Sequence, residues 1–222
     1  MKILALDAST KACSVSLLVD DRFYTQFEMA PQRHANLILG MVERVFEQAN
    51  ISGSALDALA FSDGPGAFTG VRIAAGVVQG LAFGWQKPVI SVTSLEALAW
   101  QAWQQTQVSP VFASLDARMQ ELYCQVCTIE QGHLSSEPPK LLTEQGALAF
   151  LNSNPADLGI GDIGPEFPAV VDALPKWIEA YPSAEAVAAV ASQRIHDAKP
   201  VTEQVPVPVY LRNDVAEKPR AV

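Results

Sequence analysis

The first residues that could do chemistry are a carboxylate and two hydroxyls in one short turn, at Asp7, Ser9 and Thr10. They lie between two apolar runs, residues 2–7 and 12–19, that have the pattern of paired strands. In such a hairpin the hydroxyls and free amides can bind a phosphate while the carboxylate binds its cation. The same residue types also satisfy the backbone of an ordinary turn. Both interpretations stay open, with the ordinary turn as the default.

A second candidate is the glycine-rich run from Gly64 to Arg72, which follows a short apolar strand at 57–62 and opens a helix. Loops of this kind suit anions, because free amides and the positive end of the helix dipole point at the ligand. The run lacks the Lys and Ser or Thr of a Walker motif, and its glycine spacing does not fit a dinucleotide fingerprint. The alternative is a turn that needs glycine torsions and a helix cap from Thr69.

Metal and redox chemistry have little support. Cys124 and Cys127 form the only close cysteine pair, and no second pair or nearby His completes a ligand set. They fall in a predicted strand, where positions three apart point to opposite faces. The three histidines are isolated in the sequence, without an HExxH arrangement, and no G-x-S-x-G elbow occurs. We therefore expect no metal site, no catalytic residue and no cofactor.

The predicted helix at about 69–83 is apolar nearly all round, and only Arg72 and Gln79 are strongly polar. Gly76, Gly80 and Gly84 recur every four residues, so they form a stripe where a second backbone could approach. Each interior glycine costs about 1 kcal/mol relative to alanine, which packing must offset. The stripe could face this protein's own core or another subunit, and we favour another subunit. Residues Ile73, Val77 and Leu81 are expected to cover the sheet.

The elements around these motifs indicate an α/β protein with a mixed sheet. Strands at 2–7, 12–19 and 22–28 form a meander, an amphipathic helix follows at 34–49, and strand and helix then alternate to a third helix capped by Thr93 or Ser94. A boundary is placed near residue 104, in a polar stretch. Beyond it we predict strands at 110–116 and 121–129, helices at 143–152 and 183–198, and an extended, proline-rich segment at 206–212.

Composition limits the possible partners. With 15 Lys and Arg against 24 Asp and Glu, the formal charge is −9, which argues against a protein that grips nucleic acid by itself. Hydrophobic residues make up 49%, yet no apolar stretch is long enough for a membrane span and no secretory signal opens the chain. We expect a cytoplasmic protein without membrane contact, whose apolar excess is buried in its core or against another subunit.

Four segments together resemble the bacterial TsaB (YeaZ) family: ILALDASTKACSVSLL at the start, RHANLIL at 33–39, SDGPGAFTGVRIAAGVVQGLA at 62–82 and PVYLR at 208–212. The resemblance implies an actin-like ATPase fold of the acetate kinase, Hsp70 and actin class. Its two subdomains, each a mixed sheet flanked by helices, would span residues 1–104 and 105–222. It also implies a non-catalytic dimerisation subunit, required for N6-threonylcarbamoyladenosine at position 37 of tRNAs that read codons beginning with A.

The same resemblance implies the partners. They are the catalytic subunit TsaD, the ATPase TsaE and, when the chain is alone, a second copy of itself, with tRNA reached only through the complex. Threonylcarbamoyl-AMP from a separate synthase would be the complex's substrate. The family pairs subunits through a bundle of two helices, which correspond here to 34–49 and 69–84. The implied interface residues are Leu37, Met41, Val45, Thr69, Arg72, Gly76, Gln79 and Gly80.

TsaD carries a V-N-H-x-E-G-H metal motif where this chain has residues 92–98, and Ser94 and Leu98 replace both histidines. Two rival functions remain. The hairpin at Asp7 resembles the phosphate-binding hairpin of actin-like kinases, which would fit an independent nucleotide-using enzyme. Against it, residues 116–119 lack the glycine expected in a second phosphate hairpin. A metallopeptidase, the other rival, would need a histidine pair that the sequence does not offer.

Overall fold

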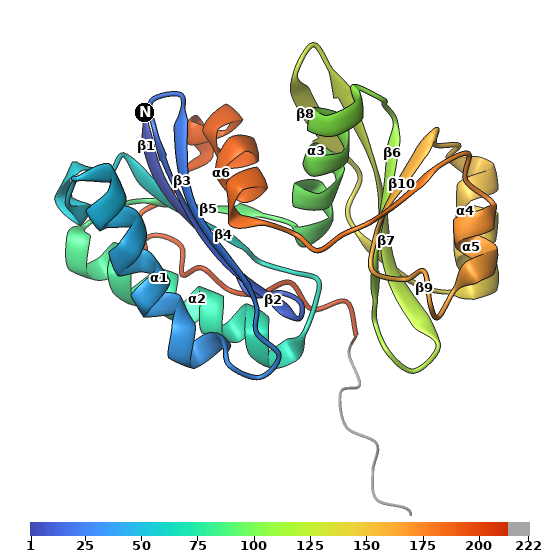
Figure 1. The fold of residues 1–222 in the computed structure, drawn as a ribbon, viewed down its shortest axis with the longest axis horizontal. Helices are drawn as coiled ribbons and strands as arrows, with labels where there is room; N and C mark the ends of the chain where they lie inside the picture. Colours follow the sequence, from blue (N-terminus) through green and yellow to red (C-terminus); the bar gives the residue numbers. More distant parts are fainter. Residues whose placement is uncertain (213–222) are drawn as a thin grey trace, which may run out of the picture.

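The computed structural model describes residues 1–212, which form two lobes side by side, each built on one β-sheet with helices against it (Figure 1). The first sheet has the order β3-β2-β1-β4-β5. Its strands are β1 (Lys2–Asp7), β2 (Ala12–Val19), β3 (Arg22–Met29), β4 (Ala58–Ser62) and β5 (Val89–Val92). The first three pair antiparallel, and β4 and β5 continue the sheet parallel to β1. The expected meander and mixed sheet are confirmed.

Both faces of the first sheet are buried at β1, β2 and β4, which explains why these strands are largely apolar, whereas the edge strand β3 is partly exposed and carries polar residues. Leu4 and Leu6 point to the face covered by α1 (His34–Ala49) and α2 (Phe68–Trp85). Ile3 and Ala5, one residue out of phase, point to the opposite face and to α6 (Ala184–Gln193). This alternation follows from the two-residue period of a strand.

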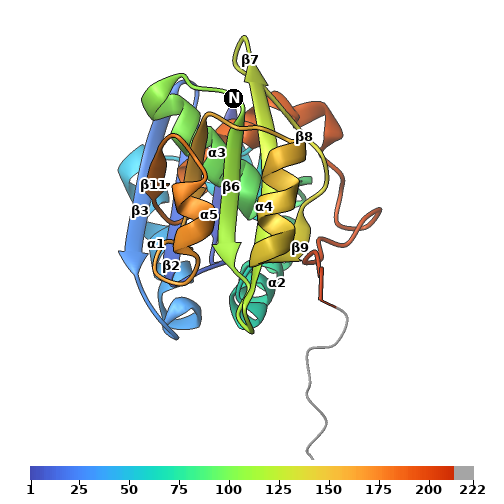
Figure 2. The same cartoon turned by 90° about the vertical axis from the view of Figure 1, so that its right-hand side faces the viewer.

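The second sheet has the order β11-β10-β6-β7-β8, with β9 also paired to β7. Its strands are β6 (Val111–Asp116), β7 (Glu121–Glu130), β8 (His133–Ser136), β9 (Lys140–Thr143), β10 (Leu158–Gly161) and β11 (Trp177–Glu179). Helices α4 (Glu144–Ser153) and α5 (Pro168–Asp172) lie in front of this sheet in Figure 2, and α3 (Ser94–Thr106) lies behind it. Two short 3₁₀ turns lie at Gly53–Ala55 and Ile195–Asp197.

The two lobes repeat one topology. In each, an antiparallel hairpin (β1–β2 or β6–β7) is followed by two further strands, β4–β5 or β10–β11, that run parallel to its first strand. The helix that follows the last strand of each lobe packs on the other lobe's sheet: α3 lies against β6, β7 and β10, while α6 lies against β1, β2 and β4. Both helices share one core cluster with strands of both sheets. The lobes are therefore joined through a common core, and the division at residue 104 stays a prediction.

Most expected elements of the second half are present, with differences at their ends. Strands β6 and β7 and helix α4 lie within two residues of the predicted ranges, and the helix predicted at 183–198 ends earlier, at Gln193. The polar stretch in which the boundary is predicted belongs largely to a helix, because α3 continues to Thr106. Thr93 caps α3 in a capping box with Glu96, as expected. The predicted cap at Thr69 is wrong, because α2 begins at Phe68 without a side-chain cap.

No helix within residues 1–212 combines the length and the apolarity needed to cross a bilayer.

Candidate functional site

Helix α2 presents its glycine stripe to open space. A Cβ atom built at Gly76, Gly80 or Gly84 meets no atom within 4 Å. The opposite side of the helix, including Val71, Ala74 and Val78, is buried against the sheet. The stripe therefore faces away from this protein's own core.

The neighbouring side chains differ from expectation in one respect. Ile73, Val77 and Leu81 are only half-buried at the edge of the core, so they do not provide the sheet-covering face as predicted. The residues that cover the sheet are instead their sequence neighbours, among them Ala74 and Val78. Because α2 is apolar on nearly all sides, its sequence does not show which face packs on the sheet.

Close packing requires two glycines near the start of α2, Gly66 in the preceding loop and Gly70 in the first turn of the helix. A Cβ at Gly66 would collide with the carbonyl oxygen of Ser9, and one at Gly70 with that of Ala8. The backbone amide of Ala67 donates a hydrogen bond to the Ser9 carbonyl at 2.6 Å. These glycines therefore seat the loop on the β1–β2 turn, which explains the motif without any ligand.

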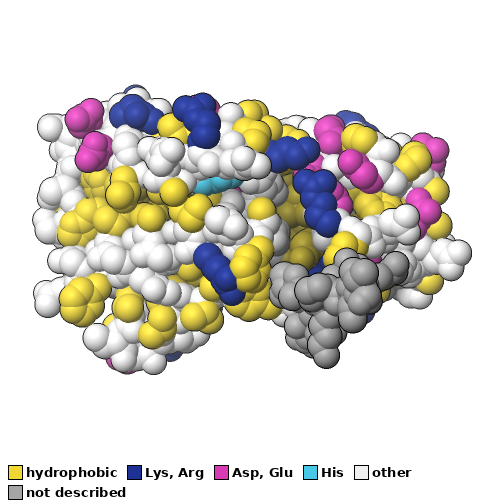
Figure 3. All heavy atoms as spheres, turned by 90° about the horizontal axis from the view of Figure 1, so that it is seen from below, with side chains coloured by type: hydrophobic (Ala, Val, Ile, Leu, Met, Phe, Trp, Pro, Cys, Tyr) yellow, Lys and Arg dark blue, Asp and Glu magenta, His cyan; other side chains and the backbone are white. Residues whose placement is uncertain are grey.

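The predicted interface residues fall into three groups. Thr69, Gly76 and Gly80 are exposed, and Leu37 is half-buried on α1. Met41 and Val45 have 1% and 0% of their surface exposed and pack inside the first lobe, so assigning them to a partner contact is wrong. The apolar stripe of an amphipathic helix covers its own sheet first. Exposed apolar side chains on the same two helices are instead Leu39, Phe68 and Phe83. Figure 3 shows hydrophobic side chains gathered on this face of the first lobe, at the left of the view.

Arg72 and Gln79 already have partners in this chain. The Arg72 Nε donates to the Tyr210 hydroxyl at 2.8 Å, and its guanidinium lies 3.5 Å from the centre of the Phe68 ring. Gln79 donates its side-chain amide to the Pro206 carbonyl. Both hold the segment after α6 along the flank of α2. Their predicted role in a partner contact stays a prediction.

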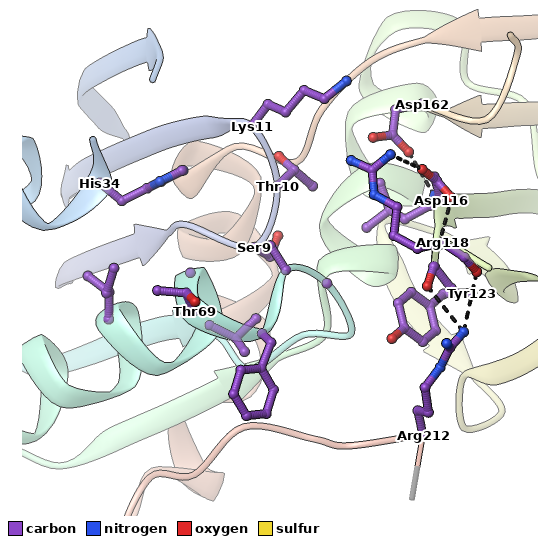
Figure 4. Close-up of a pocket in the computed structure, with 18 of the residues that line it drawn as sticks. Ser9, Thr10, Lys11, His34, Thr69, Asp116, Arg118, Tyr123, Asp162 and Arg212 are labelled. Atoms are coloured by element: carbon purple, nitrogen blue, oxygen red, sulfur yellow. Dashed lines mark hydrogen bonds and ion pairs between the residues drawn. The ribbon is translucent and has the colours of Figure 1, made fainter. Parts of the chain in front are cut away.

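A cleft of about 790 Å³ opens between the two lobes. The β1–β2 turn lines one wall with Ser9 and Thr10, and the β6–β7 turn lines the other with Asp116 and Arg118, as Figure 4 shows. Lys11 extends from the first wall toward Asp162 on the second (Figure 4). The sequence-predicted turn thus lies where a ligand between the lobes would meet it.

The polar groups of the first wall satisfy one another. The Asp7 carboxylate accepts hydrogen bonds from the Ser9 amide at 3.1 Å and from the Ser9 hydroxyl, while Thr10 Oγ1 accepts from the Ala12 amide at 3.3 Å. Asp7 is fully buried, and burial raises its pKa to about 6, although the Ser9 bonds offset part of this effect. This is the bonding of an ordinary Asx-type turn. Phosphate binding at these residues stays a prediction.

The charged side chains of the second wall are paired with one another or bonded to its backbone. Arg118, Met119 and Gln120 all have left-handed backbone angles, with φ of 63°, 57° and 61°, where a phosphate-binding turn would favour glycine. Arg118 pairs with Asp116 at 2.8 Å, and the Asp116 amide donates to Asp162 at 2.9 Å. Burial raises the pKa of Asp162 to about 6. The wall therefore offers paired charges rather than free amides.

Residues 92–98, which the resemblance aligns with the TsaD metal motif, are mostly buried. Ser94 donates its hydroxyl to the Pro65 carbonyl, and Leu98 lies in the core. Glu96 accepts from the Thr93 amide, the Ser136 hydroxyl and the Arg194 guanidinium, with a closest distance of 2.7 Å to Arg194. Across the part of the chain that the structure describes, no group of three or more His, Cys, Asp or Glu side chains could hold a metal ion.

Two features of this region escaped the sequence analysis. Asp63 lies beside Glu96 with its Oδ1 buried and unpaired among the described residues, and burial followed by the Glu96 charge raises the pKa of Asp63 to about 8. The Glu96–Arg194 pair joins residues 98 positions apart, which no local pattern could reveal.

The cysteine prediction is confirmed in its geometry, because Cys124 and Cys127 are buried on opposite faces of their sheet.

Comparison with known proteins identifies the family. A family model described as TsaD, tRNA N6-adenosine threonylcarbamoyltransferase, matches residues 23–220. The tRNA threonylcarbamoyladenosine biosynthesis protein TsaB of Escherichia coli (strain K12) is 36% identical over 230 residues, covering 98% of this chain and 97% of that protein. The chain belongs to the TsaB family. The expected resemblance is thereby confirmed.

A solved structure supports the family's fold. The structure described as YeaZ from Pseudomonas aeruginosa matches with a TM-score of 0.82 and 37% identity, covering 95% of this chain and 99% of that one. With two mixed sheets flanked by helices, this TsaB-family chain has the actin-like ATPase fold expected from its sequence. The tRNA N6-adenosine threonylcarbamoyltransferase of Thermomicrobium roseum is 38% identical over 76 residues, 34% of this chain and 21% of that protein. The match to this transferase therefore spans about a third of the chain.

Proposed function

We propose that this protein acts in tRNA threonylcarbamoyladenosine biosynthesis as a non-catalytic subunit that binds a TsaD-family transferase. Membership in the TsaB family supports the pathway, since its curated members bear the name of a threonylcarbamoyladenosine biosynthesis protein. The modified base would be adenosine 37 of tRNAs that read codons beginning with A. The work takes place in the cytoplasm, and tRNA is reached through the complex.

One observation supports the proposed mode of action: no atom of the described chain covers the glycine stripe of α2. Interior glycines at Gly76 and Gly80 each cost about 1 kcal/mol relative to alanine, and no atom of the described chain makes use of the space they leave. A helix from another subunit can approach such a stripe closely, and exposed Phe68 and Phe83 lie on the same helix. The occupant in the complex is the transferase, and a second copy of this chain takes its place in the isolated protein.

The filled metal segment supports the non-catalytic part of the proposal. At the positions of the two TsaD histidines stand Ser94, bonded to a carbonyl, and Leu98, buried in the core. Glu96 is committed to Arg194 and to the cap of α3. Transfer chemistry would then belong to the transferase, while the ATPase TsaE joins the assembly as a further partner. The cleft, whose polar groups are paired with one another, supports the rival nucleotide-using enzyme less well.

The test is Gly80→Leu, with Gly76→Leu as a second variant. A leucine on the stripe adds four carbons where the partner helix approaches, and overfilling a packed contact costs about 1–3 kcal/mol. We expect binding to the TsaD-family subunit of the same genome to weaken at least about tenfold in a titration, with unchanged or higher thermal stability of the isolated chain. Gln145→Leu, an exposed position on α4 in the other lobe, is the matched control and should bind normally.

Two results would contradict the proposal. If Gly80→Leu binds the transferase as tightly as the wild type, the stripe is not the contact. If the isolated wild-type chain hydrolyses ATP at about 1 s⁻¹ or faster, within the usual enzyme range, the chain is an enzyme in its own right.

A further inference from the structure

Residues 205–212 form an extended segment, here called the strap, that runs along the flank of α2 toward the second lobe (Figure 1). Gln79 bonds to the carbonyl of Pro206, and Arg72 bonds to the hydroxyl of Tyr210. Seven helical residues rise about 10 Å, and four residues of extended chain cover about 12 Å, so the two spacings match. The strap therefore lies antiparallel to α2 and is attached to it at two points.

The far end of the strap is attached to the other lobe. The Val209 amide first donates to the Asp63 carbonyl at 2.8 Å, at the end of β4. Arg212 then reaches the β6–β7 turn, where its guanidinium pairs with the Glu121 carboxylate and donates to the carbonyls of Ala117 at 3.2 Å and Arg118 at 3.3 Å (Figure 4). Only 16% of the Arg212 side chain is exposed. One short segment thus connects α2, β4 and the second wall of the cleft.

The strap is held by side chains and single backbone bonds rather than by a β-ladder. Pro206 and Pro208 have no amide to donate, and no strand is formed between 205 and 212. Proline also stiffens the segment in its extended form, so seating it costs little conformational entropy. The strap can therefore leave or take its seat without breaking either sheet.

We propose that the strap is a clasp that couples the partner-binding face of α2 to the placement of the second lobe, with Arg212 as the residue that fastens it. The inference rests on the proposed function for the identity of the partner. Arg72 and Gln79 stand beside the glycine stripe, and the seated strap fixes both side chains. Val205, Val207 and Val209 are exposed and add apolar surface to a segment that is bonded to α2. A partner on the stripe therefore meets a complete face only when the strap is seated.

Linkage makes this coupling measurable in both directions. If seating of the strap strengthens partner binding by some factor, partner binding must favour the seated strap by the same factor. Removal of the fastening residue should then loosen the strap and weaken the partner contact together, although Arg212 itself lies at the cleft and not on the stripe.

The first experiment measures seating in the isolated full-length chain. Chymotrypsin cleavage after Tyr210 or Leu211 is followed by mass spectrometry, because a protease needs the segment released from its seat. Arg212→Ala should be cut there at least about five times faster than the wild type. Arg118→Ala is the matched control, since it removes an arginine side chain that pairs with Asp116, while the Arg118 carbonyl that accepts from Arg212 is kept, and it should be cut at the wild-type rate. Equal cleavage of all three proteins would overturn the clasp.

The second experiment measures coupling with the TsaD-family subunit of the same genome. Arg212→Ala should bind it at least about fivefold more weakly than either the wild type or Arg118→Ala, and saturating partner should slow cleavage of the wild-type strap. Wild-type affinity in Arg212→Ala would overturn the coupling while leaving the proposed function intact. Failure of the wild type to bind the subunit would contradict the proposed function and the coupling with it, and the cleavage assay would still decide whether the clasp exists.

Discussion

At the scale of single residues, Glu96 is a buried carboxylate that holds separate parts of the fold together. Glu96 is 5% exposed and accepts hydrogen bonds from the cap of α3, from β8 and from Arg194. The carboxylate therefore ties three parts of the chain together. These bonds account for Glu96 as a structural residue.

The pair between Glu96 and Arg194 gives the first prediction. Arg194→Ala leaves a carboxylate in the core without its counter-charge, which should lower the free energy of unfolding by about 3 kcal/mol. The control is Arg33→Ala, since Arg33 pairs with Glu28 on the surface, with 60% and 41% of the two side chains exposed. Such a surface pair contributes about 0.5 kcal/mol or less. Urea denaturation measures both, and equal losses would show that Glu96 does not depend on Arg194.

Asp63 gives a prediction about pH. Burial and the Glu96 charge raise the pKa of Asp63 to about 8, against about 4 in an unfolded chain. A carboxyl with a higher pKa in the folded state contributes stability that is complete below the unfolded pKa and is lost as the pH rises through the folded one. The wild type should therefore lose stability as the pH rises from about 4 to about 8, while Asp63→Asn should lose less over the same range. Parallel pH profiles of the two proteins in denaturant titrations would disprove the assignment.

At the scale of elements, local patterns predicted the chain well where a strand or helix is long and periodic. The meander, α1, α3 and the β6–β7 pair all follow from alternating or helical spacing of apolar residues. Strands β10 and β11 escaped because they have four and three residues, and β10 contains Gly159 and Gly161, which pack against neighbouring side chains and backbone. Such short strands are defined by the sheet around them rather than by their own sequence.

Faces of helices were harder to predict than the helices themselves. Met41 and Val45 belong to the apolar face of α1, and that face covers the first sheet. The sequence shows that a helix has an apolar face but not whether this chain or a partner covers it. In α2 the glycines show which face is buried more clearly than the large side chains do. A Cβ atom at Gly70 would collide with the Ala8 carbonyl oxygen, whereas one at Gly76, Gly80 or Gly84 would meet no atom of the described chain.

Two glycines of one helix should accordingly respond in opposite ways to alanine. Gly70→Ala places a methyl group against the Ala8 carbonyl oxygen and should lower the free energy of unfolding by about 1–3 kcal/mol or more. Gly76→Ala meets open space and should raise it by up to about 1 kcal/mol through helix propensity. Both positions lie in α2 with ordinary backbone angles, so each serves as the other's control. Thermal melts that rank them in the reverse order would refute the packing of the loop on the β1–β2 turn.

At the scale of the whole molecule, each lobe depends on a helix, α3 or α6, that follows the last strand of the other lobe. Helix α3 comes from the first half of the sequence and packs on the second sheet, while α6 returns from the second half to cover the first. Residues Ala184, Val187 and Val190 of α6 are fully buried in the core cluster that both sheets share. Two lobes that look separate in outline therefore depend on each other for a complete core, and periodicity in the sequence gave no sign of this exchange.

The last prediction is that the lobes fold as one unit. A fragment of residues 1–107 keeps every strand of the first sheet but loses α6, which exposes Ile3, Ala5 and Ala60 on a face that is fully buried in the whole chain. Burial of apolar surface contributes about 25 cal/mol per Å², so a sheet bare on one face lacks much of its stabilisation. The fragment should show no cooperative unfolding by calorimetry. A fragment of residues 1–204, which keeps α6 and lacks the strap, should unfold in one transition with matching calorimetric and van't Hoff enthalpies. A cooperative transition in the shorter fragment would show instead that the first lobe folds independently, with α6 as an accessory rather than as part of its core.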